Sequence, residues 1–108
     1  MEITTNPEQH FINIDLPKSY DYSTVNDFYN IFREVDIALD CIDLNFAGTN
    51  YADSSALGML LYVRDLFPDA KIRLFNCKPC IYRLFYIAKF ADLFVLEGHL
   101  EIPQPLAA

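Results

Sequence analysis

The fold of this chain is decided by the stretch ADSSALG, residues 52–58, which follows a strand-like segment and opens a helix-like one. Asp53, Ser54 and Ser55 are all preferred N-cap types and stand directly before an apolar periodic segment. One or two hydroxyls are therefore expected at a helix N-terminus, where free backbone N–H groups and the helix dipole favour an anion. A phosphate on Ser54 would lie in that field. The simpler interpretation is that these residues only cap the helix.

Size, composition and charge restrict the class of protein. The 108 residues suffice for one domain, and a content of 53% hydrophobic residues is typical of a packed globule. The formal net charge of −7 argues against nucleic acid and anionic membranes as partners. The longest apolar run, Ala56–Val63, is too short to span a bilayer, and Met1–Thr4 does not begin like a signal peptide. Three cysteines suggest no disulfide framework, so we expect a reduced, cytoplasmic protein.

Three segments alternate between apolar and polar residues with a period of two, which predicts strands buried on one face. They are Phe11–Leu16, Cys41–Phe46 and Lys71–Phe75. Strands covered by helices on both faces would be continuous apolar runs, so a doubly wound fold is disfavoured. A short first strand is expected near Glu2–Thr5, with a turn at Asn6-Pro7.

Apolar residues at helical spacing predict three helices between and after these strands. The first begins at Asp21 or Ser23, the second ends at Pro68-Asp69, and the third opens near Pro79. Their apolar faces are Val25, Phe28, Ile31, Phe32 and Val35; Ala56, Leu60, Val63 and Phe67; and Ile81, Leu84, Phe85 and Ala88. Alternating strands and helices pair in parallel through right-handed crossovers. The predicted class is α/β, a mixed sheet of about four to five strands with helices packed mainly on one face.

The order of these elements resembles a STAS domain. A strand is followed by the helix Asp-Ser-Ser-Ala-Leu-Gly-Met-Leu-Leu, then by a second strand, and then by Asn76…Pro79, which opens another helix. The likeness is strongest to the small bacterial anti-sigma-factor antagonists. It covers Phe11–Leu96, and its most specific part is Asp53–Leu61. A single STAS domain over residues 1–102 is therefore expected, with a flexible tail at 103–108.

The resemblance implies a phosphorylation site. In phosphoregulated members the serine directly after the motif aspartate accepts the phosphate, and here that residue is Ser54, with Asp53 before it and Ser55 beside it. A second family aspartate, at the end of the second strand and near the phosphorylation site, matches Asp21. The family usually has a glycine three residues before that aspartate, where this chain has Lys18. The two aspartates have a simpler possible role in loop and capping chemistry.

The function implied by the resemblance is a non-enzymatic, partner-switching adaptor. An anti-sigma factor or related serine kinase would bind the unphosphorylated protein, and a serine phosphatase would reset it. Phosphate on Ser54 adds about −1.5 to −2 charges at the contact surface, which would inactivate or retarget binding. The kinase supplies the nucleotide and magnesium, so no cofactor is expected in this chain. The alternative is a non-phosphorylated STAS scaffold subunit of a membrane transport or lipid-transport complex, because a fold does not determine function.

Gly58, Leu61 and Tyr62 are the predicted partner-binding residues. Leu61 and Tyr62, together with Tyr82 and Tyr86, are expected on helix faces turned away from the core. A glycine inside a helix costs about 0.8–1 kcal/mol relative to alanine, and close approach of a partner would offset that cost. These residues form either an aromatic partner patch or scattered surface positions.

Other chemistry is poorly supported by the sequence. Cys77 and Cys80 form a Cys-x-Pro-Cys motif at a helix start, as in thioredoxin-like enzymes, but too little chain follows to complete that fold. A zinc site needs four ligands, and Cys41, His10 and His99 lie elsewhere in the sequence. The histidines belong to no triad-like arrangement. The sequence therefore predicts neither a catalytic site nor a metal site.

Overall fold

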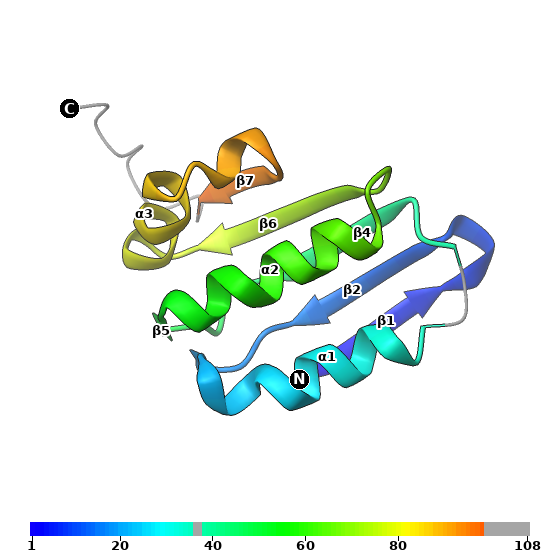
Figure 1. Ribbon diagram of the computed structural model, residues 1–108, viewed down its shortest axis with the longest axis horizontal. Helices are drawn as coiled ribbons and strands as arrows, with labels where there is room; N and C mark the ends of the chain where they lie inside the picture. Colours follow the sequence, from blue (N-terminus) through cyan, green and yellow to red (C-terminus); the bar gives the residue numbers. More distant parts are fainter. Residues whose placement is uncertain (36–37, 99–108) are drawn as a thin grey trace.

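The main element of the fold is a five-stranded mixed sheet with the order β1-β2-β4-β6-β7, in a computed structural model that describes residues 1–35 and 38–98 (Figure 1). β1 (Glu2–Asn6) is antiparallel to β2, and every other neighbouring pair is parallel. The parallel strands are β2 (Phe11–Asp15), β4 (Cys41–Asn45), β6 (Lys71–Cys77) and β7 (Val95–Gly98). The three strands predicted from alternation are confirmed to within two residues at each end, and the first strand expected near Glu2–Thr5 is confirmed as β1. Periodicity did not identify β7.

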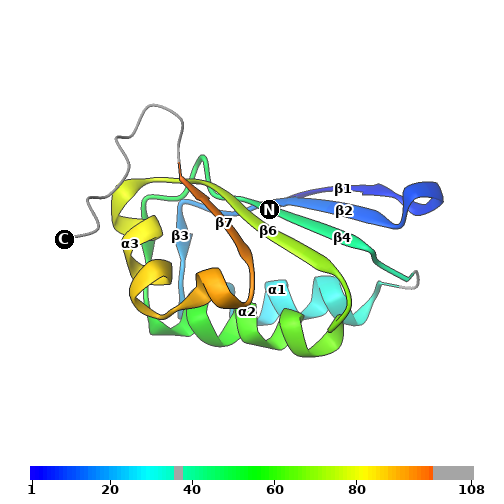
Figure 2. The ribbon, with the colours of Figure 1, turned by 90° about the horizontal axis from the view of Figure 1, so that it is seen from above.

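The three α-helices found in the described residues lie on the same side of this sheet, as can be followed in Figure 2, and this confirms the expected one-sided cover. They are α1 (Val25–Arg33), α2 (Ser54–Leu66) and α3 (Pro79–Ile87). Single 3-10 turns occupy η1 (Pro7–Gln9), η2 (Tyr22–Thr24) and η3 (Phe90–Asp92). Within the described part of the chain, no helix has the length and apolar character required to cross a membrane.

The core lies between the sheet and the helices. In register, Ile12, Ile42 and Ile72 form one row across β2, β4 and β6, and Ile14, Leu44 and Leu74 form the next. All six side chains are at most 1% exposed. Burial of each such side chain contributes about 1.5–3 kcal/mol, so the two rows are the main support of the sheet.

The opposite face of the sheet is polar, and no helix of residues 1–35 and 38–98 covers it. Arg73 donates to both carboxylate oxygens of Asp43, its cross-strand partner, from Nε at 3.2 Å and from Nη2 at 2.6 Å. Its guanidinium also lies over the Phe75 ring at 4.4 Å from the centroid. The alternating polar residues of the predicted strands therefore form this open face.

A second sheet of two short strands lies at one end of the molecule. β3 (Ser19–Tyr20) pairs in parallel with β5 (Tyr51–Ala52), and neither strand was predicted. Figure 2 shows β3 running from the sheet layer toward the layer of helices. The expected tail at 103–108 and His99 lie outside the described residues.

Candidate functional site

The pairing of β3 with β5 brings the two aspartates of the predicted site together. Tyr20 is registered with Ala52, and Asp21 and Asp53 are the next residue of each chain segment. Neighbouring strands lie about 4.8 Å apart, so the two aspartates leave the small sheet side by side. Asp21 is followed by η2 and α1, and Asp53 is followed by α2. These helical segments therefore begin at the same end of the fold.

Asp53 is the N-cap of α2. Its Oδ1 accepts a hydrogen bond from the backbone N–H of Ser55 at 2.9 Å. Ser54 is the first residue of the helix and not its cap, so the simpler interpretation, that these residues only cap the helix, is correct for Asp53 and wrong for Ser54. Substitution of Ser54 therefore removes no side-chain cap.

Ser54 and Ser55 differ in their accessibility. Ser54 is exposed and Ser55 is half-buried. Within residues 1–35 and 38–98, the Ser54 hydroxyl forms no hydrogen bond. A free, exposed hydroxyl in the first helical turn is available to an incoming phosphoryl group, and the helix N-terminus favours the resulting anion.

Asp21 caps the neighbouring turn in the same way. Its Oδ1 accepts from the backbone N–H of Ser23 at 3.0 Å and from the Ser23 hydroxyl at 2.6 Å. The expectation that Asp21 ends the second strand is wrong, because β2 ends at Asp15 and Asp21 follows the separate strand β3. Among the described residues only His10, Asn76 and Lys89 have a left-handed backbone without being glycine, so Lys18 fits its loop without that strain.

Tyr20, the residue directly before Asp21, anchors this part of the chain in the core. The side chain is fully buried, and its ring lies edge-on to Phe28 at 5.4 Å and to Phe46 at 5.6 Å. Its hydroxyl has no hydrogen-bond partner within the described residues. Burial, and to a lesser degree the nearby Tyr29, raises the pKa of Tyr20 well above 10.0, so the phenol stays neutral. The aromatic packing fixes the strand that positions Asp21.

The predicted partner-binding residues of α2 are not equally available. Gly58 is exposed, and a Cβ added there would meet nothing within 4 Å. Leu61 is 40% exposed. Tyr62, however, is half-buried, and its ring lies 4.4 Å from that of Tyr29 on α1. The expectation that Tyr62 and Tyr82 face away from the core is therefore wrong, because both pack against it.

Two exposed tyrosines beside the aspartates were missed. Tyr22 follows Asp21 and is 79% exposed, and Tyr51 lies on β5 and is 52% exposed. Exposed tyrosines are enriched among the residues that contribute most to protein binding. The sequence did carry a signal for these two residues, because each tyrosine lies within two residues of a motif aspartate.

The cysteines and histidines occupy separate environments. Cys77 is buried at the end of β6, and burial raises the pKa of its thiol to about 12, whereas a redox nucleophile needs a lowered pKa. Cys80 is exposed in the first turn of α3. His10 contacts Asp40, with 3.1 Å between Nδ1 and Oδ2. No group of three or more potential metal ligands is present in the described ranges.

Sequence comparison identifies relatives of the whole domain. The family model for the STAS domain matches residues 4–102. A STAS-domain containing protein of Pseudomonas aeruginosa strain UCBPP-PA14 is 33% identical over 101 residues, which span 90% of this chain and 100% of that protein.

Solved structures share the fold at low sequence identity. A sulfate transporter family protein from Wolinella succinogenes superposes with a TM-score of 0.72 at 7% identity, over 85% of this chain and 80% of that chain. The anti-sigma factor antagonist SpoIIAA in its unphosphorylated form gives a TM-score of 0.71 at 19% identity, over 88% and 85% of the two chains. The phosphorylated form of SpoIIAA, described as a Bacillus cell fate determinant, gives 0.63 at 20% identity, over 88% of each chain.

Proposed function

We propose that this chain, which belongs to the STAS domain family, is a protein-binding switch controlled by phosphorylation of Ser54. The observation that carries the proposal is the juxtaposition of Asp21 and Asp53 by the register of β3 and β5, with Ser54 exposed directly behind Asp53. The solved relative SpoIIAA, which occurs in unphosphorylated and phosphorylated forms, supports it through a shared fold.

The switch acts through charge at one end of the molecule. Phosphate adds about −1.5 to −2 charges beside two carboxylates that already lie there. A partner that presents acidic or apolar groups to this end is then repelled, or must desolvate a phosphate. The contact surface includes Gly58 and Leu61 of α2 together with Tyr22 and Tyr51, which are exposed around the aspartates. The partners are a serine kinase of the anti-sigma-factor type and a serine phosphatase in the cytoplasm.

A constitutive scaffold in a membrane transport complex is the second candidate. The likeness to the sulfate transporter family protein from Wolinella succinogenes favours it, with a TM-score of 0.72. A scaffold needs no accessible serine beside paired aspartates. A scaffold subunit isolated from its own cells would accompany transporter components and carry no phosphate.

The test compares two serine variants expressed in the native cells. Wild-type protein and Ser55→Ala should show a mass gain of one phosphate, located on Ser54 by fragmentation, and Ser54→Ala should show none. Because Ser54 is not the cap, Ser54→Ala should retain nearly full stability, with a change within about 0.5 kcal/mol. Phosphate on Ser55 alone, or no phosphoform together with transporter subunits, would contradict the switch.

Binding is then measured by calorimetry with the co-purified partner. Ser54→Ala should bind like the unphosphorylated wild type, and Ser54→Asp should bind more weakly because it adds a charge at the contact surface. Equal affinities of the two folded variants would exclude the charge mechanism.

A further inference from the structure

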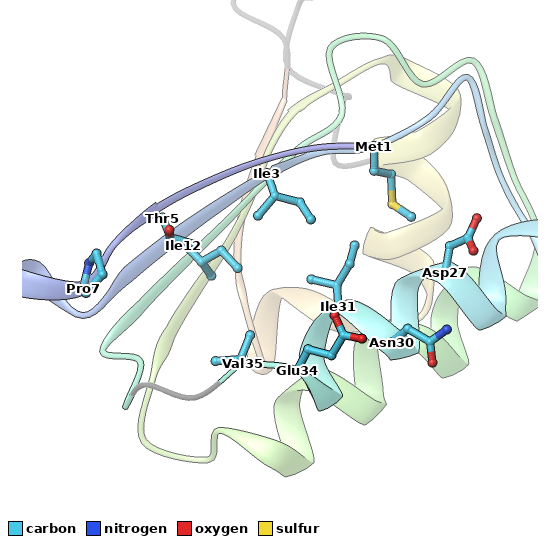
Figure 3. Close-up of a pocket in the computed structure, with 10 residues that line it drawn as sticks. All are labelled: Met1, Ile3, Thr5, Pro7, Ile12, Asp27, Asn30, Ile31, Glu34 and Val35. Carbon is cyan, nitrogen blue, oxygen red and sulfur yellow. The ribbon is translucent and has the colours of Figure 1, made fainter.

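A groove of about 550 Å³ lies between β1 and α1. Figure 3 shows Ile3 and Ile12 on the sheet side facing Ile31 and Val35 on the side of α1. Asp27 and Glu34, both exposed, line the same groove from α1. Its volume lies within the roughly 300–1,000 Å³ typical of ligand sites.

Beside the groove, α1 packs against α2 through two aromatic pairs. Tyr29 lies on Tyr62, and the rings of Phe32 and Phe67 are 6.0 Å apart. Ile3 is registered with the buried Ile14 and so points to the helical side, yet it remains 45% exposed. The outermost strand thus carries one apolar side chain, Ile3, that the helix layer leaves partly exposed.

The free edge of β1 is unprotected. Among the described residues β1 pairs only with β2, and its register of Glu2–Asn6 runs without a bulge. The strand contains neither lysine nor proline, and its one charged residue, Glu2, lies on the opposite face of the sheet from Ile3. Edge strands normally carry such devices because their unpaired backbone groups are a template for another strand. An extended peptide can use such an edge by strand addition.

The charge around the groove selects the occupant. Asp27 and Glu34 form no ion pair within residues 1–35 and 38–98. The nearest cation on α1, Arg33, donates from Nη1 to Asn30 at 3.3 Å. A second copy of this chain, with its net charge of −7, would bring further acidic residues to an acidic rim. A basic segment is therefore the complementary occupant.

We propose that this groove binds an extended basic peptide segment of a partner protein, separately from the Ser54 site. The segment pairs with the free edge of β1. Successive side chains of a strand point to opposite faces of the sheet. Apolar side chains on the groove side of the segment therefore lie on Ile3 and Ile31, and lysine or arginine side chains two residues further along, on that same side, reach Asp27 and Glu34. This combination of an edge strand, an apolar floor and an acidic rim gives both main-chain affinity and side-chain selection.

The charge requirement is tested at near-physiological ionic strength with a fluorescent peptide in which every second residue is in turn valine or lysine, separated by threonine. Valine and lysine then share one face of the extended peptide. The double variant Asp27→Lys/Glu34→Lys should weaken binding about tenfold or more. The matched control Asp69→Lys/Asp92→Lys changes two exposed acidic residues elsewhere, alters the net charge equally, and should stay within about twofold. Equal losses in both double variants would show general attraction to an acidic protein and would overturn the proposal.

The apolar floor and the strand edge have separate readouts. Ile3→Ala should weaken binding of the peptide. The matched control is Ile87→Ala, the same change at an isoleucine on α3 that is 67% exposed, and it should leave peptide binding unchanged. Hydrogen exchange should show new protection of the β1 amides when the peptide is bound. Protection only at the start of α2 would overturn the proposal, because the peptide would then bind elsewhere. A dimer of the free protein that Ile3→Ala dissociates would also overturn it, because the occupant of the groove would then be a second copy of this chain.

Discussion

The side chains of Asp21 and Asp53 each accept a hydrogen bond from the backbone N–H of the residue two positions further on. Each aspartate thereby starts a helical turn. Loss of such a cap costs about 0.5–2 kcal/mol. Both carboxylates are therefore structural and also contribute negative charge beside Ser54. A substitution that keeps the acceptor, such as Asp21→Asn, separates these roles, because it removes charge while leaving an oxygen for Ser23.

The buried thiol of Cys77 makes the folded state sensitive to alkaline pH. Its pKa is raised from 9.0 to about 12 in the folded protein. Between these values the unfolded chain loses the proton and the folded protein keeps it, so stability falls as pH rises. The slope is about 1.4 kcal/mol per pH unit above pH 9. Urea unfolding under reducing conditions should show a loss of about 1.4 kcal/mol between pH 8 and 10 in the wild type.

The control for this pH effect is Cys77→Ala, which removes the titrating thiol and should flatten that part of the profile. Tyr20, whose pKa is also raised by burial, adds a loss of the same sign at higher pH and is unchanged in the variant. An identical pH dependence of the two proteins between pH 8 and 10 would refute a raised thiol pKa.

Individual residues of the candidate site were only partly predictable. The motif placed Asp53 and Ser54 at a helix start, but three adjacent capping residue types left the cap itself undetermined. Tyr62 was misplaced because the helical pattern of α2 describes one helix alone, whereas α1 lies beside it and covers the tyrosine. Tertiary contacts of this kind have no signal in local periodicity.

On the scale of elements, α2 combines a packed face with an exposed glycine. Gly58→Ala should raise the free energy of unfolding by about 1 kcal/mol, because an added Cβ meets nothing within 4 Å and alanine is the better helix former. Gly58→Arg should also fold but abolish partner binding by steric block. Thermal unfolding and a pull-down of the partner measure both effects, with Gly58→Ala as the matched control.

The two variants test the role of Gly58 in different ways. Loss of binding in Gly58→Ala, with the fold intact, would support close approach of the partner at Gly58, because one methyl group would be enough to disturb the contact. Full binding by Gly58→Arg would move the partner surface away from this face of α2.

The long elements were predictable and the short ones were not. β2, β4 and β6 alternate over five residues or more, and the three helices repeat their apolar spacing. β3 and β5 have two residues each, which is too few to show a period. Because the register of these two strands places Asp21 beside Asp53, the geometry of the site could not be obtained from periodicity, although the resemblance to STAS domains paired the same residues.

On the scale of the whole molecule, Arg64 joins segments that are distant along the chain. Its Nη2 donates to the carbonyls of Phe67 and Ala70 at 2.6 Å each, and its Nη1 donates to the carbonyl of Leu93 at 3.0 Å. The end of α2, the turn into β6 and the segment before β7 are thus held by one planar group. Arg64→Lys keeps the positive charge but not the planar, forked arrangement of N–H donors, so it should lower the free energy of unfolding by about 2 kcal/mol.

The measurement is urea unfolding of Arg64→Lys and Arg64→Met beside Arg83→Lys, an exposed arginine on α3 that should change stability by less than about 0.5 kcal/mol. Phosphorylation of Ser54 and peptide binding at the β1 groove should be retained in all three variants, because Arg64 lies at the opposite end of α2 from Ser54 and contacts neither surface. A stability loss in Arg64→Met alone would mean that positive charge and not forked geometry holds these segments. Equal stability of both Arg64 variants and wild type would show that the surrounding packing is sufficient.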